Sequence, residues 1–196
     1  MSIKYPPNEE KVDRRILRTR RLLRTALVEL MEELDFHQIT VQDITDRAMI
    51  NRTTFYTHFE DKYALLYYIG REMFKEALVA NIPQPASLTL DNVRLLLVTV
   101  CEFLWRFYDH CAPSQRSDPL PIETQVQEQV YQLFWGWIHD LDLSAEHNPQ
   151  IVATVLSWAV FGSALQWARD KERLDLDNYV DQVMPMLVNG IQPLLV

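Results

Sequence analysis

A short stretch beginning at Arg52, RTTFYTHF, combines many hydrogen-bonding side chains with two phenylalanines. Wound as a helix at about 100° per residue, Phe55 and Phe59 share one stripe. Arg52, Thr53 and Tyr56 share the neighbouring stripe. Arginine can donate two hydrogen bonds to O6 and N7 of a guanine, and hydroxyl groups can donate to phosphate oxygens. Because two phenylalanines can anchor a helix that is too short to be stable alone, the pattern favours an outward face that contacts DNA.

Further polar residues are placed to extend this surface. Thr54 and His58 form a third stripe of the same short helix and can donate to phosphates. The backbone amide at Thr40 lies at the start of a predicted helix, where anions are favoured. Lys62 adds a full positive charge beside the start of another helix. Gln42, near the start of the helix that precedes the short one, can reach a base edge.

The elements that must position these residues are four predicted helices, at about residues 13–34, 40–48, 52–59 and 61–80. The first helix carries one apolar stripe, formed by Leu23, Leu27, Leu30 and Leu34. Thr40 and Asn51 are good N-caps for the second and third helices. These two helices, joined by a three-residue turn, form a helix-turn-helix, whose second helix enters the major groove of DNA.

A proline-containing stretch, NIPQPAS at residues 81–87, ends the fourth helix. We therefore place a domain boundary there, between residues 1–80 and residues 81–196. Helices are predicted beyond it at residues 89–109, 122–140, 148–170 and 177–192, and Pro185 should kink or break the last one. Only four glycines occur, and they are scattered, which excludes a Rossmann fingerprint, a P-loop and a nucleophile elbow and favours an all-α fold.

The charge of the chain is divided unequally between its ends. The 196 residues carry a net charge of −8, which is a poor first indication of nucleic-acid binding. Residues 1–28, however, hold eight Lys/Arg against three acids, a net +5, whereas residues 80–196 hold six against fourteen, a net −8. Arg14, Arg18, Arg21 and, loosely, Arg24 share one side of the first helix. They form either a contact to the DNA backbone or a solvated basic face.

The sequence gives no sign of a metal site, a cofactor or a membrane span. The two cysteines, Cys101 and Cys111, make neither a disulfide framework nor a metal-binding pattern, and buried inert thiols are favoured over a redox sensor. The first 20 residues are polar and charged, unlike a signal peptide. The longest apolar run, residues 95–101, is too short to cross a membrane. We expect a protein of the reducing cytoplasm.

A dense set of residues in fixed order marks a family resemblance. The matching residues are Thr19-Arg20, Ala26-Leu27, Ile39-Thr40-Val41-x-Asp43-Ile44, Ala48, Asn51-Arg52-x-Thr54-Phe55-Tyr56-x-His58-Phe59-x-Asp61-Lys62 and Leu65-Leu66. In this stretch, about residues 19–66, the chain resembles the DNA-binding domain of TetR/AcrR-family transcriptional regulators. The resemblance implies an all-α homodimer that binds double-stranded DNA at a palindromic operator. It also implies that residues 81–196 dimerise and bind a small-molecule effector.

By position, the resemblance assigns a role to each polar residue of the motif. Contacts to the DNA backbone are implied for Thr40, Thr54, Tyr56, His58 and Lys62, and base readout for Gln42, Arg52 and Thr53. Two residues depart from the family pattern, which usually has glycine at the positions of Met49 and Asp35. We expect Met49 to accept a left-handed backbone conformation at a modest cost, or the turn to differ slightly.

Two predictions concern the C-terminal helices. Ala159, Gly162, Ser163 and Gln166 lie at i, i+3, i+4 and i+7, and three of them are small, so another helix can approach closely. That helix belongs either to a second subunit or to the same chain, and the resemblance favours the subunit, with residues 148–170 and 177–192 forming a four-helix interface. The aromatic residues Trp105, Tyr108, Trp135, Trp158 and Phe161 either line a ligand pocket or form a plain core.

Three classes of function were compared. A sequence-specific DNA-binding regulator accounts for the motif, and the resemblance favours a repressor. An all-α enzyme is not supported, because the sequence has no paired carboxylates, no activated nucleophile and no metal set. A helical protein-interaction module without DNA binding fits the acidic overall charge but not the intact Arg52, Tyr56 and Lys62.

Overall fold

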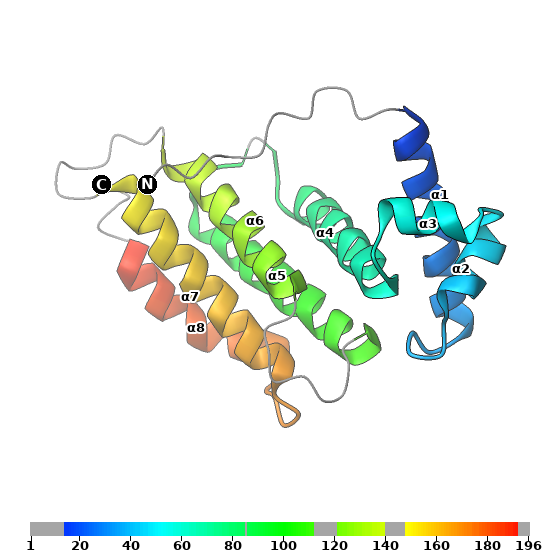
Figure 1. The fold of residues 1–196 in the computed structure, drawn as a ribbon. Helices are drawn as coiled ribbons and strands as arrows, with labels where there is room; N and C mark the ends of the chain where they lie inside the picture. Colours follow the sequence, from blue (N-terminus) through cyan, green and yellow to red (C-terminus); the bar gives the residue numbers. More distant parts are fainter. Residues whose placement is uncertain (1–13, 85, 112–120, 140–147, 192–196) are drawn as a thin grey trace. The chain divides into compact units, whose positions relative to one another are not determined.

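The structure is a computed structural model that describes residues 14–84, 86–111, 121–139 and 148–191. Within these ranges it contains eight α-helices and no β-strand (Figure 1). The helices are α1 (Arg14–Glu33), α2 (Val41–Ala48), α3 (Arg52–His58), α4 (Lys62–Asn81), α5 (Leu90–Cys111), α6 (Pro121–Ile138), α7 (Pro149–Arg169) and α8 (Leu176–Ile191). The predicted all-α fold is confirmed, and each predicted helix end lies within two residues of the observed one.

The chain divides into two compact units, Met1–Ile69 and Gly70–Val196. The division falls inside α4, whereas the sequence predicted a boundary at residue 81, after this helix. α4 has no proline that would interrupt it before Pro83, so the helix continues across the division. The assignment of a separate function to each part of the chain stays a prediction.

The N-terminal unit is held together by apolar residues from α1, α2, α3, the loop after α1 and the start of α4. Its fully buried side chains are Leu23, Leu27, Phe36, Ile39, Ile44, Phe55 and Leu65. Helix α1 contacts both α2 and α3, and these two helices contact each other. Leu34, which the sequence placed in the apolar stripe of the first helix, is 42% exposed, because α1 ends at Glu33 and Leu34 begins the following loop.

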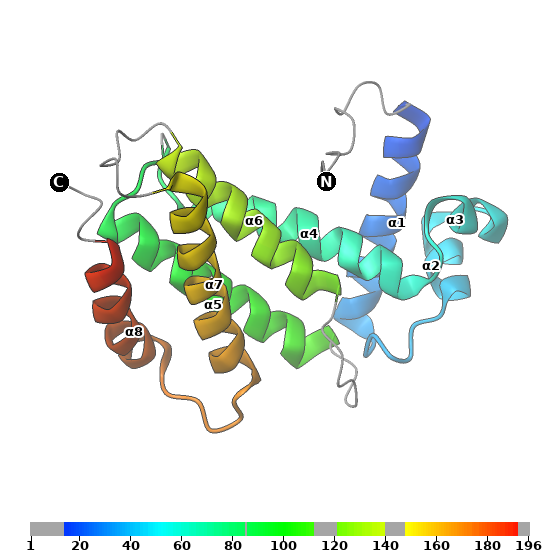
Figure 2. The same cartoon turned by 60° about the vertical axis from the view of Figure 1, so that its left-hand side comes forward.

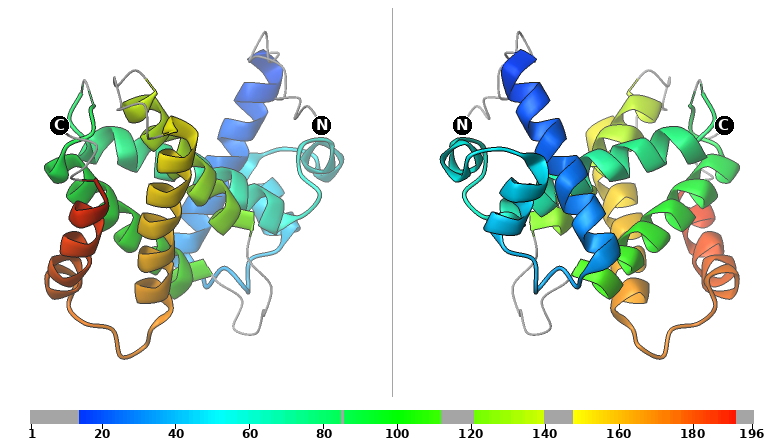
Figure 3. Two further views of the ribbon diagram at one scale, coloured as in Figure 1. Left: turned by 90° about the vertical axis from the view of Figure 1, so that its left-hand side faces the viewer. Right: turned by 90° about the vertical axis from the view of Figure 1, so that its right-hand side faces the viewer.

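The C-terminal unit is a helical bundle in which α7 lies between α6 and α8 and also contacts α5 (Figures 2 and 3). Its core is lined by Leu96, Val100, Leu104, Val126, Val130, Phe134, Val160 and Ala164, all without exposed surface. Helix α8 runs through Pro185 and is not broken there. Because proline has no N–H group, the carbonyl group of Asp181 loses its helical hydrogen bond at this point.

Helix α7 is the most apolar of the long helices. It is the one helix in the described part of the chain that is long and apolar enough to cross a membrane by length and composition, and 44% of its apolar window is buried against the protein. Core helices of globular proteins pass the same test. Helix α7 contacts α5, α6 and α8, and burial against these three helices accounts for its apolar composition.

Candidate nucleic-acid interface

The turn between α2 and α3 takes the first of the two alternatives left open for Met49, a left-handed backbone. Met49 has a φ of 53° and a ψ of 44°, in the left-handed region, and its side chain is 92% exposed. The N–H of Met49 donates to the Asp46 carbonyl (3.1 Å), and the N–H of Ile50 donates to the Thr45 carbonyl (2.9 Å). This pair of hydrogen bonds ends α2 and directs the chain into α3.

Helix α3 is pinned by the two phenylalanines. Phe55 is fully buried and Phe59 nearly so, and their ring centroids lie 6.0 Å apart. At the other end, the Asn51 side chain accepts a hydrogen bond from the N–H of Thr53 (2.8 Å), which caps the helix. A helix of seven residues therefore has a fixed position without needing stability of its own.

The outward stripe of α3 presents an arginine and a tyrosine that contact each other. Arg52, Thr53 and Tyr56 are all exposed. The Nη2 of Arg52 donates to the Tyr56 hydroxyl (3.2 Å), and the guanidinium carbon lies 5.6 Å from the centroid of the Tyr56 ring. These two contacts with Tyr56 restrict the orientation of the Arg52 side chain in the unbound protein.

The other polar residues of α3 lie at its edges. Thr54 and His58 are half-buried, and the His58 ring lies 6.5 Å from the ring of Phe59. The carbonyl of Thr54 accepts a hydrogen bond from the Thr57 hydroxyl (2.7 Å). Both side chains keep part of their surface exposed, which is compatible with their predicted backbone contacts.

Thr40 and Asp43 form a capping box at the start of α2. The N–H and the hydroxyl of Thr40 both donate to Oδ2 of Asp43 (2.8 and 2.7 Å), and the N–H of Asp43 donates back to the Thr40 hydroxyl oxygen (3.2 Å). These hydrogen bonds from Thr40 hold the pKa of the Asp43 carboxyl below its usual range. Gln42 is exposed beside the cap, and its Nε2 donates to Oδ1 of Asp46 (2.7 Å).

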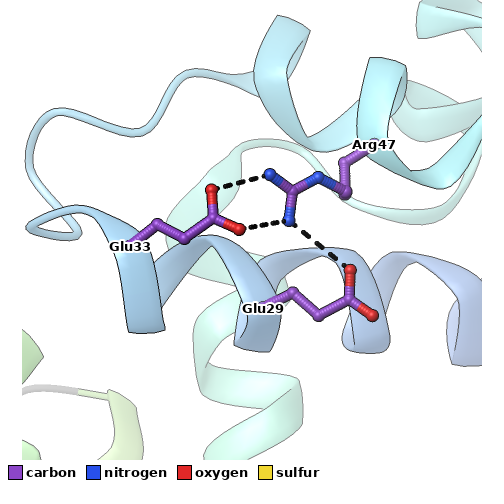
Figure 4. Close-up of polar contacts among 3 residues, drawn as sticks. All are labelled: Glu29, Glu33 and Arg47. Carbon is purple, nitrogen blue, oxygen red and sulfur yellow. Dashed lines mark hydrogen bonds and ion pairs between the residues drawn. The ribbon is translucent and has the colours of Figure 1, made fainter.

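Arg47 fixes α2 on α1 through an ion pair that sequence reasoning missed. Its guanidinium donates two hydrogen bonds to the Glu33 carboxylate (3.0 and 2.8 Å), and Nη1 lies 3.5 Å from Oε2 of Glu29 (Figure 4). Arg47 and Glu33 are 14 residues apart, so no local spacing indicated the pair. The hydrogen bonds from Arg47, together with its charge, lower the pKa of the Glu33 carboxyl.

Arg20, one of the residues that carry the family resemblance, packs against two aromatic rings. Its guanidinium carbon lies 5.8 Å from the ring centroid of Phe59 and 5.4 Å from that of Tyr68. It thus connects α1 with the end of α3 and with α4 inside the same unit. Arg14, Arg18 and Arg21 are exposed on α1, as the predicted basic face requires.

Lys62 points into the protein. Its Nζ donates to the carbonyl oxygens of Phe36, His37 and Ile39. An ammonium group has three donors, so all of them are used within the N-terminal unit. This geometry does not favour the predicted contact between Lys62 and a phosphate.

The residues that form this helix-turn-helix coincide with a known protein family. A family model described as "Bacterial regulatory proteins, tetR family" matches residues 23–69. Over these residues the chain is similar to the DNA-binding region of TetR-family regulators. TetR-family proteins are transcriptional regulators rather than enzymes, and they bind DNA, typically as dimers that take small-molecule ligands.

Two curated relatives are similar to part of the chain. The chain is 35% identical over 85 residues to an uncharacterized HTH-type transcriptional regulator, YxbF of Bacillus subtilis, which covers 41% of this chain and 22% of the relative. It is 36% identical over 63 residues to DhaS of Lactococcus lactis, an HTH-type dhaKLM operon transcriptional activator, which covers 32% of this chain and 34% of DhaS. The chain thus spans about a fifth to a third of the length of these relatives.

Two solved structures of transcriptional regulators share the fold over most of the chain. A regulator from Pectobacterium atrosepticum superposes with a TM-score of 0.63 at 19% identity, covering 95% of this chain and 98% of that one. FadR of Bacillus subtilis, solved in complex with stearoyl-CoA, superposes with a TM-score of 0.55 at 17% identity, covering 87% and 98%. At these identities the likeness shows the fold alone.

The aromatic residues predicted to line an effector pocket in the TetR-like C-terminal unit are not brought into one cluster. Trp158 is 55% exposed and lies against the buried Phe161, with ring centroids 5.9 Å apart. Trp135 stacks on His139, at 5.6 Å. Among the ring contacts of the described residues, none joins these two pairs to Trp105, whose ring lies 6.5 Å from that of Trp167.

Tyr108, the fifth predicted pocket residue, belongs to a polar cluster between α5, α6 and α7. Its hydroxyl donates to the buried carboxylate of Glu123 and accepts from Nε of Arg169 (3.1 Å). The Nη2 of Arg169 also lies 2.6 Å from Oε1 of Glu123. Burial, together with the Glu123 carboxylate, raises the pKa of Tyr108.

The guanidinium of Arg173 lies over the rings of Trp105 and Trp167, at 4.9 and 5.2 Å.

Of the four residues predicted for a dimer interface, Gly162 and Gln166 are exposed and Ala159 and Ser163 are half-buried. The Ser163 carbonyl accepts a hydrogen bond from the Tyr179 hydroxyl of α8 (2.8 Å), so Ser163 also serves packing within the chain.

Cys101 is buried, which raises its pKa to about 12 and suits an inert thiol. The Cys111 side chain lies outside the described residues. No group of three metal-ligating side chains was found in the described ranges.

Proposed function

We propose that this protein is a sequence-specific DNA-binding regulator of transcription that binds a palindromic operator as a homodimer. One observation carries the proposal: Arg52 and Tyr56 project together from a helix that Phe55 and Phe59 fix to the core. A rigid, exposed and positively charged helix after a helix-turn-helix turn is suited to the major groove. The proposed site of action is the cytoplasm, where bacterial DNA lies.

The exposed side chains divide into two groups by the atoms they can reach. We assign base readout to Arg52, Thr53 and Gln42, because they lie at the N-terminal ends of α3 and α2. Contacts to phosphates are assigned to Thr40, Thr54, Tyr56 and His58, whose hydroxyl and imidazole groups can donate to phosphate oxygens. The basic side of α1 adds attraction that does not depend on sequence.

The proposed dimer uses the exposed side of α7 and α8. Ile151, Val155 and Trp158 are more than half exposed and follow one another at i, i+4 and i+7, and Gly162 continues the same line at i+11. Met186 of α8 is also largely exposed. A second copy of the chain would bury this apolar line, and two copies would present two copies of α3 to a palindrome.

A small-molecule effector is proposed to bind the C-terminal unit. The effector changes the affinity for DNA if it binds one conformation of the protein more tightly than another. The structural neighbour FadR was solved with stearoyl-CoA, an acyl thioester. Whether the regulator represses, as we predict, or activates, as the relative DhaS does, is decided by a reporter gene placed behind the operator.

The test is selection of bound duplexes from a random pool by the purified full chain. We expect a palindromic consensus and an affinity that falls steeply with salt. Arg52→Ala should lose the preference at one base pair of each half-site, by about 1–3 kcal/mol. The control is Arg71→Ala, which removes an exposed arginine from α4 outside the N-terminal unit. Enrichment of no sequence would favour a protein-interaction module instead.

A further inference from the structure

Lys62 makes an unusually complete set of contacts for a lysine at the start of a helix. Its ammonium lies 2.9 Å from the Phe36 carbonyl oxygen, 3.1 Å from that of His37 and 2.7 Å from that of Ile39. These three carbonyl groups belong to the loop that joins α1 to α2. The three N–H groups of the ammonium have one acceptor each, so the Nζ atom of Lys62 joins this loop to the start of α4.

The surroundings of the ammonium restrict it further. It lies 4.7 Å from the ring centroid of Phe36 and 5.6 Å from that of Tyr63, and these two rings meet edge to face. Phe36 is almost completely buried. Burial lowers the pKa of Lys62, although the Asp35 and Asp43 carboxylates act in the opposite direction. To reach a phosphate, the ammonium would have to leave three hydrogen bonds and both rings.

The tied loop leads directly into the cap of α2. Ile39 is buried, and the next residue, Thr40, forms the capping box with Asp43. The position of these residues sets where α2 begins, and α2 carries the turn into α3. A shift of the loop would therefore move both groups of residues that we assign to DNA contacts.

We propose that Lys62 is a positioning residue for DNA binding, which holds the 36–39 loop and thereby Thr40 and α2, and that it makes no direct phosphate contact. This inference rests on the proposed DNA-binding function. Its chemistry nevertheless differs from that of a phosphate contact, because the charge of Lys62 is used to bind carbonyl dipoles within the protein.

Two substitutions separate positioning from direct contact. Lys62→Met keeps an unbranched side chain up to the ε position and removes the charged ammonium, whereas Lys62→Arg keeps the charge but replaces the compact ammonium by a planar guanidinium. Lys75→Met, on the exposed side of α4, is the control for loss of a lysine. Affinity for a duplex recovered from the random pool is measured over a series of salt concentrations, at a temperature where each variant is folded.

If Lys62 positions the loop, Lys62→Met and Lys62→Arg both weaken binding, by about tenfold, because hydrogen bonds from a charged donor are lost. The slope of log K against log salt stays that of the wild type. If Lys62 contacts a phosphate, Lys62→Met lowers the magnitude of the slope by about 0.9 for each lysine lost, and Lys62→Arg binds like the wild type. Either of these last results would overturn the proposal.

Hydrogen exchange in the free protein tests the same idea without DNA. The amides of Gln38, Ile39 and Thr40 have hydrogen-bond acceptors within or beside the loop. In Lys62→Met they should exchange faster, by about tenfold, while amides of α7 keep their rates. Unchanged exchange of the loop would overturn the proposal. If the wild-type protein binds no duplex, the proposed function is wrong. The exchange measurement still tests whether Lys62 holds the loop.

A measurement on the wild type covers the case in which the variants fail to fold. The ¹⁵N signal of the Lys62 ammonium should show couplings through its hydrogen bonds to the ¹³C carbonyl carbons of residues 36, 37 and 39, in free and in duplex-bound protein. Replacement of these couplings by a coupling to a ³¹P nucleus on binding would contradict the proposal.

Discussion

Arg52 and Tyr56 show how one residue prepares another for binding. A free arginine loses rotamer entropy when it binds, whereas the Tyr56 ring and hydroxyl already restrict the Arg52 guanidinium in the unbound protein. The same tyrosine is assigned a phosphate contact, so its hydroxyl has two tasks at neighbouring sites.

Tyr56→Phe tests this preparation. The ring stays and continues to stack on Arg52, but the hydroxyl is lost, so we expect affinity for the selected duplex to fall by about 1 kcal/mol, or about fivefold. The base preference should be retained because Arg52 is still present. Fluorescence anisotropy measures the affinity, and melting should be unchanged because Tyr56 is exposed. An unchanged affinity would contradict the role of the hydroxyl.

Met49 carries backbone strain that a glycine would remove. A left-handed conformation costs a residue with a Cβ about 1–2 kcal/mol, whereas glycine loses about 0.4–1 kcal/mol through the entropy of the unfolded chain. Since the exposed Met49 side chain has little packing to lose, Met49→Gly should raise the free energy of unfolding of the N-terminal unit by about 0.5 kcal/mol. Chemical denaturation checks this. Met49→Ala, which keeps the Cβ, should bring no gain.

At the scale of elements, the recognition helix depends on its phenylalanine anchors. Phe55→Ala removes a fully buried ring and should destabilise the N-terminal unit by about 3–5 kcal/mol. All five tryptophans lie after residue 81, so their fluorescence reports only the C-terminal unit. We therefore expect partial loss of helical circular dichroism at a temperature where tryptophan fluorescence is still native. Simultaneous unfolding by both signals would contradict independent anchoring of the α3 region.

The ion pair between α1 and α2 makes the stability of the N-terminal unit depend on pH. The hydrogen bonds and charge of Arg47 lower the pKa of Glu33 from its usual value of 4.5. The pair therefore stabilises the fold above about pH 4.5, and this contribution is lost as the pH falls through the lowered pKa.

Glu33→Gln should accordingly lower the melting temperature of the N-terminal unit at neutral pH, and the difference from the wild type should vanish in acid. Because Glu33 is exposed, the effect is small and weaker at high salt. The matched control is Glu32→Gln, an exposed neighbour on the same helix. A difference that persists in acid, below the lowered pKa of Glu33, would point to packing rather than charge.

At the scale of the whole molecule, dimerisation should depend on the apolar line along α7. Trp158→Glu places a charge in the proposed interface and should raise the dimer dissociation constant at least tenfold, on the order of a hot-spot substitution. Sedimentation velocity measures it, with Met73→Glu, the same charge on an exposed position of α4, as the control. If Trp158→Glu stays a dimer, the interface lies elsewhere.

The sequence by itself determined the features that depend on neighbouring residues. The caps at Thr40 and Asn51 and the burial of Phe55 and Phe59 follow from residue types within one or two helical turns, and the structure confirms them. Such interactions are local, so periodicity and capping chemistry are sufficient to place them.

Tertiary structure decided what joins residues far apart in the chain. Lys62 reaches carbonyl groups 23 to 26 residues earlier, and Arg47 reaches Glu33 across 14 residues. The direction of a long side chain is set by which acceptor lies within reach, and that acceptor comes from another element. For the same reason the sequence could count the aromatic residues of the C-terminal helices but could not show that Trp158 faces outward while Phe161, three residues later, is buried.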